Sequence, residues 1–109
     1  MLMKVQFSIE YRTSFGEELF INILLHKNEK GKTEEKVVKM MTTDGLQWNT
    51  EIVFDAKSVD YVDYYYCVNH NGEDGRSEWT VVPHRLDINN KYALIYKTND
   101  IWIDNPIDS

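Results

Sequence analysis

The sequence lacks several features on which whole classes of protein depend. Of its 109 residues one is a cysteine, Cys67, so an internal disulfide cannot form and a cytosolic setting is favoured. No apolar run reaches membrane-spanning length, and residues 1–5 lack the apolar core and cleavage site of a signal peptide. We therefore expect a cytoplasmic protein that is neither secreted nor inserted in a membrane. Its Cys67 is expected as a buried, reduced thiol rather than a reactive one.

Positive charge is also scarce. Lys and Arg number 12 against 18 Asp and Glu, which gives a net charge of -6 and a pI near 4.9. Nucleic acids and anionic membrane surfaces attract clustered Lys and Arg, so neither is predicted as a partner, and a neutral ligand is favoured. The proportions of 42% hydrophobic and 28% charged residues are typical of a folded protein. The length predicts a single domain over residues 1–109.

Side-chain clusters that support catalysis or metal binding are missing as well. The carboxylates are scattered over predicted turns, without the apolar surroundings that raise a carboxyl pKa for acid-base chemistry. The three histidines have no metal-ligand spacing, and residues 69–74 resemble a calcium loop without its terminal Glu. Residues 31–33 end like a phosphate-binding loop, but His26 stands where that motif needs a glycine. We expect no metal, no cofactor and no active site in this domain.

What the sequence does contain is a succession of short strand patterns. Apolar residues alternate with polar ones over 5–11 and again over 46–54, which is the period of a half-buried strand. Residues 33–41 could form either a short helix or a strand. Further strands are predicted over 18–25, 92–96 and 101–103. With turns at regular spacing, the pattern predicts an all-β fold, namely an immunoglobulin-like antiparallel β-sandwich or barrel of about seven to eight strands.

The segment over residues 64–85 is the richest in aromatic side chains. Its first part reads as a strand that runs into a turn over 71–75, where Asn, Asp and Gly supply the backbone conformations that a turn requires. The returning part carries Trp79. Alternation along the strand places Tyr64 and Tyr66 on one face and Tyr65 on the other. This hairpin is the best candidate for a ligand platform.

Aromatic residues are abundant in the rest of the chain too, with 3 Trp, 7 Tyr and 4 Phe in total. Sugar rings have apolar C–H faces, so exposed aromatic rings beside hydrogen-bonding side chains suit a neutral glycan. We expect Trp48 and Trp102 to fill the core and Trp79 to meet a ligand. Phe15, at a predicted turn, is either folded back under its loop or held out to meet a partner.

The hairpin and its flanking motifs resemble the starch-binding domain of carbohydrate-binding module family twenty. That family combines an aromatic strand, a Gly-containing turn, a Glu-Trp pair and a Pro-Asn-Arg corner. The corresponding motifs of this chain follow the family's order over residues 5–7, 15–17, 44–48, 62–66, 78–79, 83–85 and 99–102. The resemblance spans nearly the whole chain and implies a non-catalytic module that binds α-glucan by aromatic stacking.

Residue by residue, the resemblance implies a first glucan-binding site around Trp79, the principal stacking ring. Tyr65 stands where the family usually has a Lys, and Thr80 where a Glu follows the Trp. His84 takes the place of a ligand-bonding Asn, so each position keeps some capacity for hydrogen bonding. The family's second Trp of this site has no counterpart, because the corresponding loop reads Glu-Lys-Gly-Lys over 29–32.

A second, weaker site is also implied by the resemblance. The family places a Tyr before a Gly-Glu pair at a turn, and this chain has Phe15 there, followed by Gly16 and Glu17. Another aromatic ring of that site falls near the third strand, where this chain offers Met40 and Met41.

The chain is similar to the N-terminal domain of disproportionating 4-alpha-glucanotransferases. That similarity implies a second starch-binding domain and a catalytic domain in the same chain, with α-glucan or maltooligosaccharide as ligand. The domain itself would not be an enzyme, and a stand-alone enzyme is the least favoured reading for want of a catalytic cluster. The alternative is a degenerate β-sandwich that no longer binds sugar and serves as an interdomain or protein-docking module.

Overall fold

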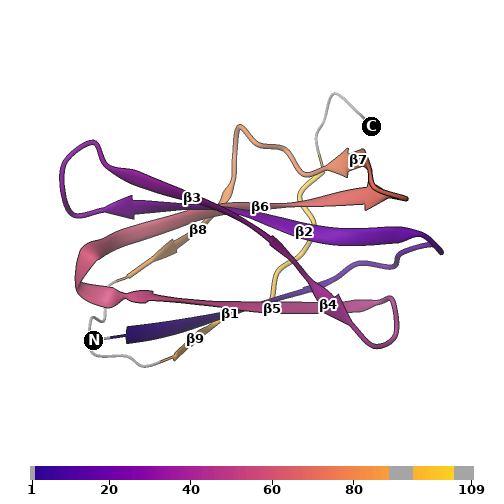
Figure 1. Ribbon diagram of the computed structural model, residues 1–109, viewed down its shortest axis with the longest axis horizontal. Helices are drawn as coiled ribbons and strands as arrows, with labels where there is room; N and C mark the ends of the chain where they lie inside the picture. The colour runs from indigo at the N-terminus through magenta and orange to yellow at the C-terminus, as the bar shows by residue number, and fades with distance from the viewer. Residues whose placement is uncertain (1, 89–94, 105–109) are drawn as a thin grey trace.

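The period-two alternation of the sequence gives each long strand one apolar and one polar face, and the apolar faces pack together. The computed structural model describes residues 2–88 and 95–104. In these residues the strands form two sheets that lie face to face (Figure 1). The predicted all-β sandwich is therefore confirmed, with nine strands in the described residues.

The first sheet has the strand order β4 (Met41–Thr42), β5 (Gln47–Asp55), β1 (Leu2–Glu10) and β9 (Ile95–Lys97). The second sheet has the order β3 (Thr33–Lys39), β2 (Glu17–Lys27), β6 (Val59–His70) and β7 (Glu73–Ser77), while β8 (His84–Asp87) pairs with the other half of the same edge of β6. A short 3-10 turn, η1 (Ala56–Ser58), connects β5 to β6 across the two sheets. Pairing is antiparallel except between β1 and β9.

The core lies between the two sheets and is formed by alternate residues of the long strands. Phe7 of β1 meets Tyr64 of β6 at a ring-centroid distance of 4.7 Å, edge to face. Trp48 is buried, as the sequence predicts, and its indole N–H donates to the Tyr11 carbonyl at 3.2 Å. Truncation of a core aromatic of this kind costs about 3–5 kcal/mol of stability. The other fully buried side chains include Met3, Val5, Ile9, Leu19, Ile21, Ile23, Leu25, Val62 and Tyr66.

The segment that could have been helix or strand is a strand. Residues Thr33–Lys39 form β3, at the edge of the second sheet, and the chain then crosses to the first sheet as β4 (Figure 1). Met40 occupies the crossing point, where its side chain is buried and its amide donates to the Leu19 carbonyl at 2.9 Å. Pairing with β2 satisfies the backbone of this segment and decides its conformation.

The hairpin predicted from the aromatic segment is present as β6 and β7. Asn71 and Gly72 both have positive φ, +50° and +85°, the conformation of the two-residue turn that matches the twist of a hairpin. Tyr64, Tyr66 and Val68 of β6 face the core, and Tyr65 lies half-buried on the outer face. The alternation predicted from sequence is therefore confirmed in this strand.

The C-terminal segment differs from the prediction. Residues 92 and 94 of the expected strand over 92–96 lie outside the described residues, and β9 covers Ile95–Lys97. Residues 101–103 are not a strand, contrary to our expectation. The chain follows β1 as far as Asp100, whose amide donates to the Ser8 carbonyl at 2.8 Å, and then leaves the first sheet so that Ile103 accepts from the Trp79 amide at 3.1 Å. Residues 101–103 therefore leave the edge of β1 and bond to the connection between β7 and β8 instead of extending a strand ladder.

Across residues 2–88 and 95–104, no helix has the length and apolar character needed to cross a membrane.

Candidate functional site

The outer face of the second sheet carries the candidate site. The register places Val37, Asn22 and Tyr65 side by side across β3, β2 and β6, because residues directly opposite in antiparallel strands point to the same face. The adjacent row reads Glu35, Leu24, Asp63 and Arg85 across β3, β2, β6 and β8. Asn22 and Tyr65 of the first row and Glu35, Leu24 and Asp63 of the second row line a surface pocket.

This pocket, which we call the Tyr65 pocket, has a volume of about 350 Å³. Two residues of the connection between β7 and β8, Thr80 and Pro83, contribute to its wall. Asn22 donates its amide N–H to Cys67 Sγ at 3.2 Å, which leaves the amide oxygen available to a ligand. The lining residues are Asn22, Ile23, Leu24, Glu35, Asp63, Tyr64, Tyr65, Thr80 and Pro83. An aromatic ring with adjacent hydrogen-bonding groups is thus present on an open surface.

A charged cluster borders the pocket at Asp63. The Arg85 guanidinium binds this carboxylate with two nitrogens, at 2.7 and 3.1 Å, and lies over the Tyr61 ring, 4.4 Å from its centre. His26 stacks on the same ring at 4.1 Å, and its Nε2 lies 3.2 Å from Asp63 Oδ2 without the alignment of a hydrogen bond. The Asp63 carboxylate raises the pKa of Arg85, so the guanidinium stays protonated. The cluster fixes one edge of the pocket and neutralises Asp63.

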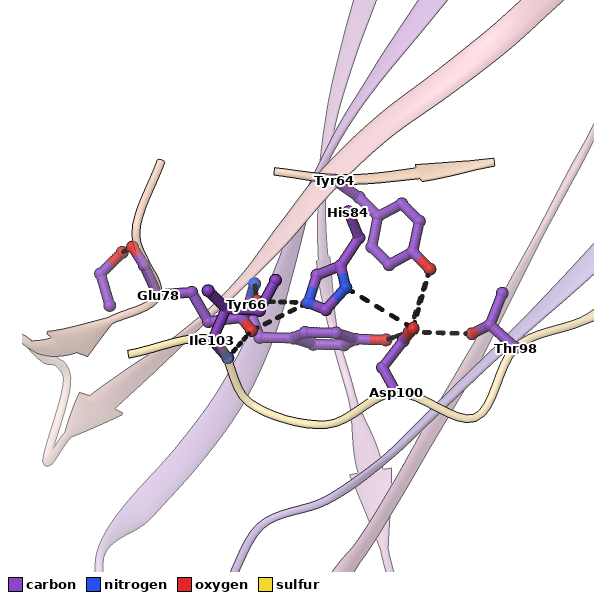
Figure 2. Close-up of polar contacts among 8 residues, drawn as sticks. Tyr64, Tyr66, Glu78, His84, Thr98, Asp100 and Ile103 are labelled. Carbon is purple, nitrogen blue, oxygen red and sulfur yellow. Dashed lines mark hydrogen bonds and ion pairs between the residues drawn. The ribbon is translucent and has the colours of Figure 1, made fainter. Parts of the chain in front are cut away.

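Behind the hairpin, Glu78 forms a buried hydrogen-bond centre although its side chain is ionisable. Its carboxylate accepts from the Tyr66 amide at 2.7 Å, from the Ile103 amide at 2.6 Å and from His84 Nε2 at 2.8 Å (Figure 2). Glu78 is 2% exposed, and these bonds compensate for the removal of the carboxylate from water. Through these two amides, Glu78 links Tyr66 of β6 to Ile103 of the C-terminal segment.

His84 lies between Glu78 and a second carboxylate, Asp100 (Figure 2). Its Nδ1 is 3.6 Å from Asp100 Oδ1, and its ring stacks on Tyr64 at 5.1 Å. Burial lowers the pKa of His84, but the hydrogen bond and charge of Glu78, with Asp100, outweigh burial and leave that pKa raised. His84 is therefore poised to be a cation between two carboxylates.

Asp100 completes this network with hydroxyl donors. Tyr64 donates to it at 3.0 Å, Tyr66 at 2.6 Å and Thr98 at 3.0 Å. Burial, together with the adjacent Asp100 carboxylate, raises the pKa of both tyrosines well above the ordinary value. Both hydroxyls consequently remain protonated donors, and the network holds the C-terminal segment to the sandwich.

The residues implied for the first glucan site do not all lie in the Tyr65 pocket. Tyr65 and Thr80 line the Tyr65 pocket. Neither Trp79 nor His84 is among the described residues that line it. The His84 ring is turned inward to Glu78. The Trp79 backbone is tied to Ile103 on the side of the C-terminal segment.

The residues implied for the second site are also separated. Phe15 is fully exposed at its turn, at 102% of the reference area, which decides between the two positions left open by the sequence. Glu17 braces the turn beneath it by accepting from the Ser14 amide at 2.5 Å. Met40 lies in the core at 1% exposure, and its position offers no surface to a ligand.

Sequence analysis did not single out Asn22, Leu24, Glu35 or Asp63. Their position on the outer face follows from the period of β2, β3 and β6, but their proximity depends on the pairing register, which a single sequence does not reveal. Cys67, on the same face, is half-buried rather than fully buried, and burial is the main cause of its raised pKa. Among residues 2–88 and 95–104, no group of three or more His, Cys, Asp or Glu side chains could hold a metal ion.

The fold and the pocket define a β-sandwich domain with a surface site on one sheet face. No protein-family model and no curated protein matches the chain. Among solved structures, the chain is similar to a glycoside hydrolase family 15 glucoamylase from Hypocrea jecorina, with a TM-score of 0.66 and 14% sequence identity. The match covers 94% of this chain and 17% of the glucoamylase. At this identity the likeness shows a shared fold, and the chain corresponds to a small part of that enzyme.

Proposed function

We propose that this domain is a non-catalytic α-glucan-binding module. The observation that carries the proposal is the Tyr65 pocket, in which a half-buried tyrosine lies beside Asn22, Glu35 and Thr80 on an open sheet face. A pyranose ring can place its C–H face on the tyrosine while its hydroxyls bond to these polar groups. The pocket volume of about 350 Å³ is sufficient for one or two sugar rings.

Two further observations support a carbohydrate ligand. The fold is shared with part of a glucoamylase, a glycoside hydrolase by name. The motifs of the hairpin resemble those of starch-binding domains, and two of the implied first-site residues, Tyr65 and Thr80, line the same pocket. Trp79 is retained as a second contact ring in this proposal, since it is half-buried and immediately precedes Thr80.

The proposal extends to the setting of the domain. We expect it to hold starch, glycogen or maltooligosaccharide for a catalytic domain of a 4-alpha-glucanotransferase, together with a second starch-binding domain, in a cytoplasmic protein. The motif resemblance supports this setting. A docking module that has lost its sugar site is the alternative, and exposed apolar side chains such as Val81 and Ile101, at 74% and 84%, are what such a module would use.

The test is calorimetric titration of the domain with maltoheptaose and with β-cyclodextrin. Tyr65→Ala is expected to weaken binding about ten-fold, because the loss of a stacking ring costs on the order of 1.4 kcal/mol. Tyr65→Phe should retain most of the affinity, since the ring is kept. Val53→Ala, at a half-exposed position on the outer face of the other sheet, is the matched control and should bind like the wild type.

Two outcomes would contradict the proposal. Absence of binding at millimolar sugar would leave the docking module as the better account. Saturable binding that Tyr65→Ala leaves unchanged would move the site away from this pocket, and Trp79→Ala, measured in parallel by calorimetry, would show whether the ring of Trp79 carries it instead.

A further inference from the structure

The two carboxylates that line the Tyr65 pocket differ in their partners. Asp63 is neutralised by the two-nitrogen contact with Arg85, at 2.7 and 3.1 Å. Glu35 stands in the same cross-strand row, opposite Leu24 of β2, and no residue of the described part of the chain forms an ion pair or hydrogen bond with it. The pocket therefore presents one uncompensated negative charge to a ligand.

The neighbouring residue shows why Glu35 is left unpaired. Glu34 points to the opposite side of β3 and binds two lysines, Lys27 at 3.6 Å and Lys36 at 3.4 Å. Because side chains alternate along the strand, Glu34 lies on the same side as Lys27 and Lys36 and pairs with them. Glu35 lies on the outer face and pairs with no cation of the described residues. The two residues carry the same charge one position apart, but only Glu35 lines the pocket.

Glu35 also acts on the aromatic ring of the site. Burial, followed by the nearby Cys67 and Glu35, raises the pKa of Tyr65. The Tyr65 hydroxyl consequently stays protonated at neutral pH and can donate to a ligand oxygen. The adjacent carboxylate oxygens accept hydrogen bonds but cannot donate them. Sugar hydroxyls and ammonium groups satisfy such an acceptor, whereas a phosphate or carboxylate group on a sugar cannot.

We propose that Glu35 determines the charge specificity of the Tyr65 pocket, which takes neutral or amino-bearing glucans and rejects phosphorylated ones. This inference rests on the proposed function, since it concerns the ligand of the same site. It names a specificity-determining residue on β3, a strand that contributes no residue of the implied first glucan site. Like charges a few ångströms apart on a protein surface discriminate by about three- to ten-fold per unit charge at low salt.

The experiment uses one ring in three charge states, namely β-cyclodextrin, its mono-6-amino derivative and its mono-6-phosphate derivative. Affinities are measured by calorimetry for the wild type, Glu35→Gln and Glu34→Gln, at low and at 0.5 M salt. The net charge of -6 repels any anion, so a preference for the amino ring alone does not locate the effect. Glu34→Gln changes the net charge by the same amount and is therefore the matched control.

We expect the wild type and Glu34→Gln to bind the amino ring best and the phosphate ring least. Glu35→Gln should bind the phosphate ring about three- to ten-fold more tightly than the wild type does, and it should keep only the weaker preference that the overall negative charge imposes. Salt should weaken the wild-type preference. Equal preferences in all three proteins would overturn the role of Glu35 while glucan binding stands. Failure of the wild type to bind neutral β-cyclodextrin would instead refute the proposed function itself.

Discussion

At the scale of single residues, Glu78 is a carboxylate whose burial requires hydrogen bonds to replace those it would make with water. A carboxylate that is 2% exposed bonds to the amides of Tyr66 and Ile103 and to His84. These amides belong to segments far apart in sequence, so one side chain satisfies the backbone of both. A cationic His84 supplies the opposite charge that makes burial of Glu78 tolerable.

The pairing of His84 predicts a pH dependence of stability. The pKa of His84 in the folded protein lies above its ordinary value of 6.5, so its contribution is complete below pH 6.5 and is lost as the pH rises through the folded-state pKa. The urea midpoint of the wild type should therefore fall between pH 6 and pH 9, and His84→Gln should show a smaller fall. Equal slopes in both proteins would mean that His84 is not charged. The wild type and His84→Gln differ in this one side chain, so the difference between their slopes reports on His84.

The sequence alone predicts only part of this network. The Glu-Trp pair at 78–79 is recognisable as a motif, but a glutamate in a polar stretch is normally exposed, so nothing local indicates the burial of Glu78. The motif resemblance predicts that His84 bonds to a ligand, whereas in the structure its ring lies between the carboxylates of Glu78 and Asp100. Partners brought together by long-range packing are not encoded by spacing along the chain.

At the scale of elements, β7 owes its shape to a bulge. Two of its residues, Gly75 and Arg76, stand opposite Val68, because the register with β6 shifts between Asn69 and Cys67. A Cβ atom on Gly75 would lie 2.8 Å from the Val68 carbonyl oxygen. Glycine is thus required by the close approach of two backbones, and the bulge directs the chain out of β7 towards Trp79.

Gly75→Ala is therefore expected to destabilise the domain by about 1–3 kcal/mol, because the backbone of one strand must shift to admit the methyl group. Urea denaturation followed by circular dichroism measures the effect. Asp74→Ala, at the exposed neighbouring position, is the control and should change stability by less than about 0.5 kcal/mol. A variant with wild-type stability would indicate that the hairpin has room that the structure does not show.

The strands themselves could largely be predicted. Alternation identified β1 and β5, and the Asn-Gly turn identified the hairpin, because both signals are local. The local pattern of residues 33–41 was ambiguous, and pairing with β2 decides it. Residues 101–103 do not form the expected strand: Ile103 bonds to Glu78 and Trp79 in the connection between β7 and β8, which no pattern of apolar residues indicates.

At the scale of the whole molecule, the C-terminal segment over residues 98–103 ties the two sheets together. Thr98 and Asp100 bond to the backbone of β1 in the first sheet. Asp100 also accepts from two tyrosines of β6, and Ile103 bonds to both residues of the 78–79 pair. Trp102 packs on Tyr11 at 4.5 Å. The segment acts as a bridge on one side of the sandwich.

Deletion of residues 98–109 should accordingly lower the stability by about 4 kcal/mol or more, since several hydrogen bonds to buried charged groups are lost together. Deletion of residues 105–109 alone is the control and retains every contact named above. Thermal unfolding and one-dimensional proton NMR measure the effect, with loss of dispersed methyl signals expected for the longer deletion. A longer deletion that unfolds like the control would show that the sheets hold together without the bridge.

The pairing of β1 with β9 has a consequence for how the domain folds. Residues 4–6 lie beside residues 95–97, so the edge of β1 that faces away from β5 is completed only by a segment far along the sequence. Until that pairing forms, β1 exposes unpaired backbone groups, which are a template for pairing with other chains. The β1–β9 pairing closes a long loop, and pairing at such sequence separation slows folding.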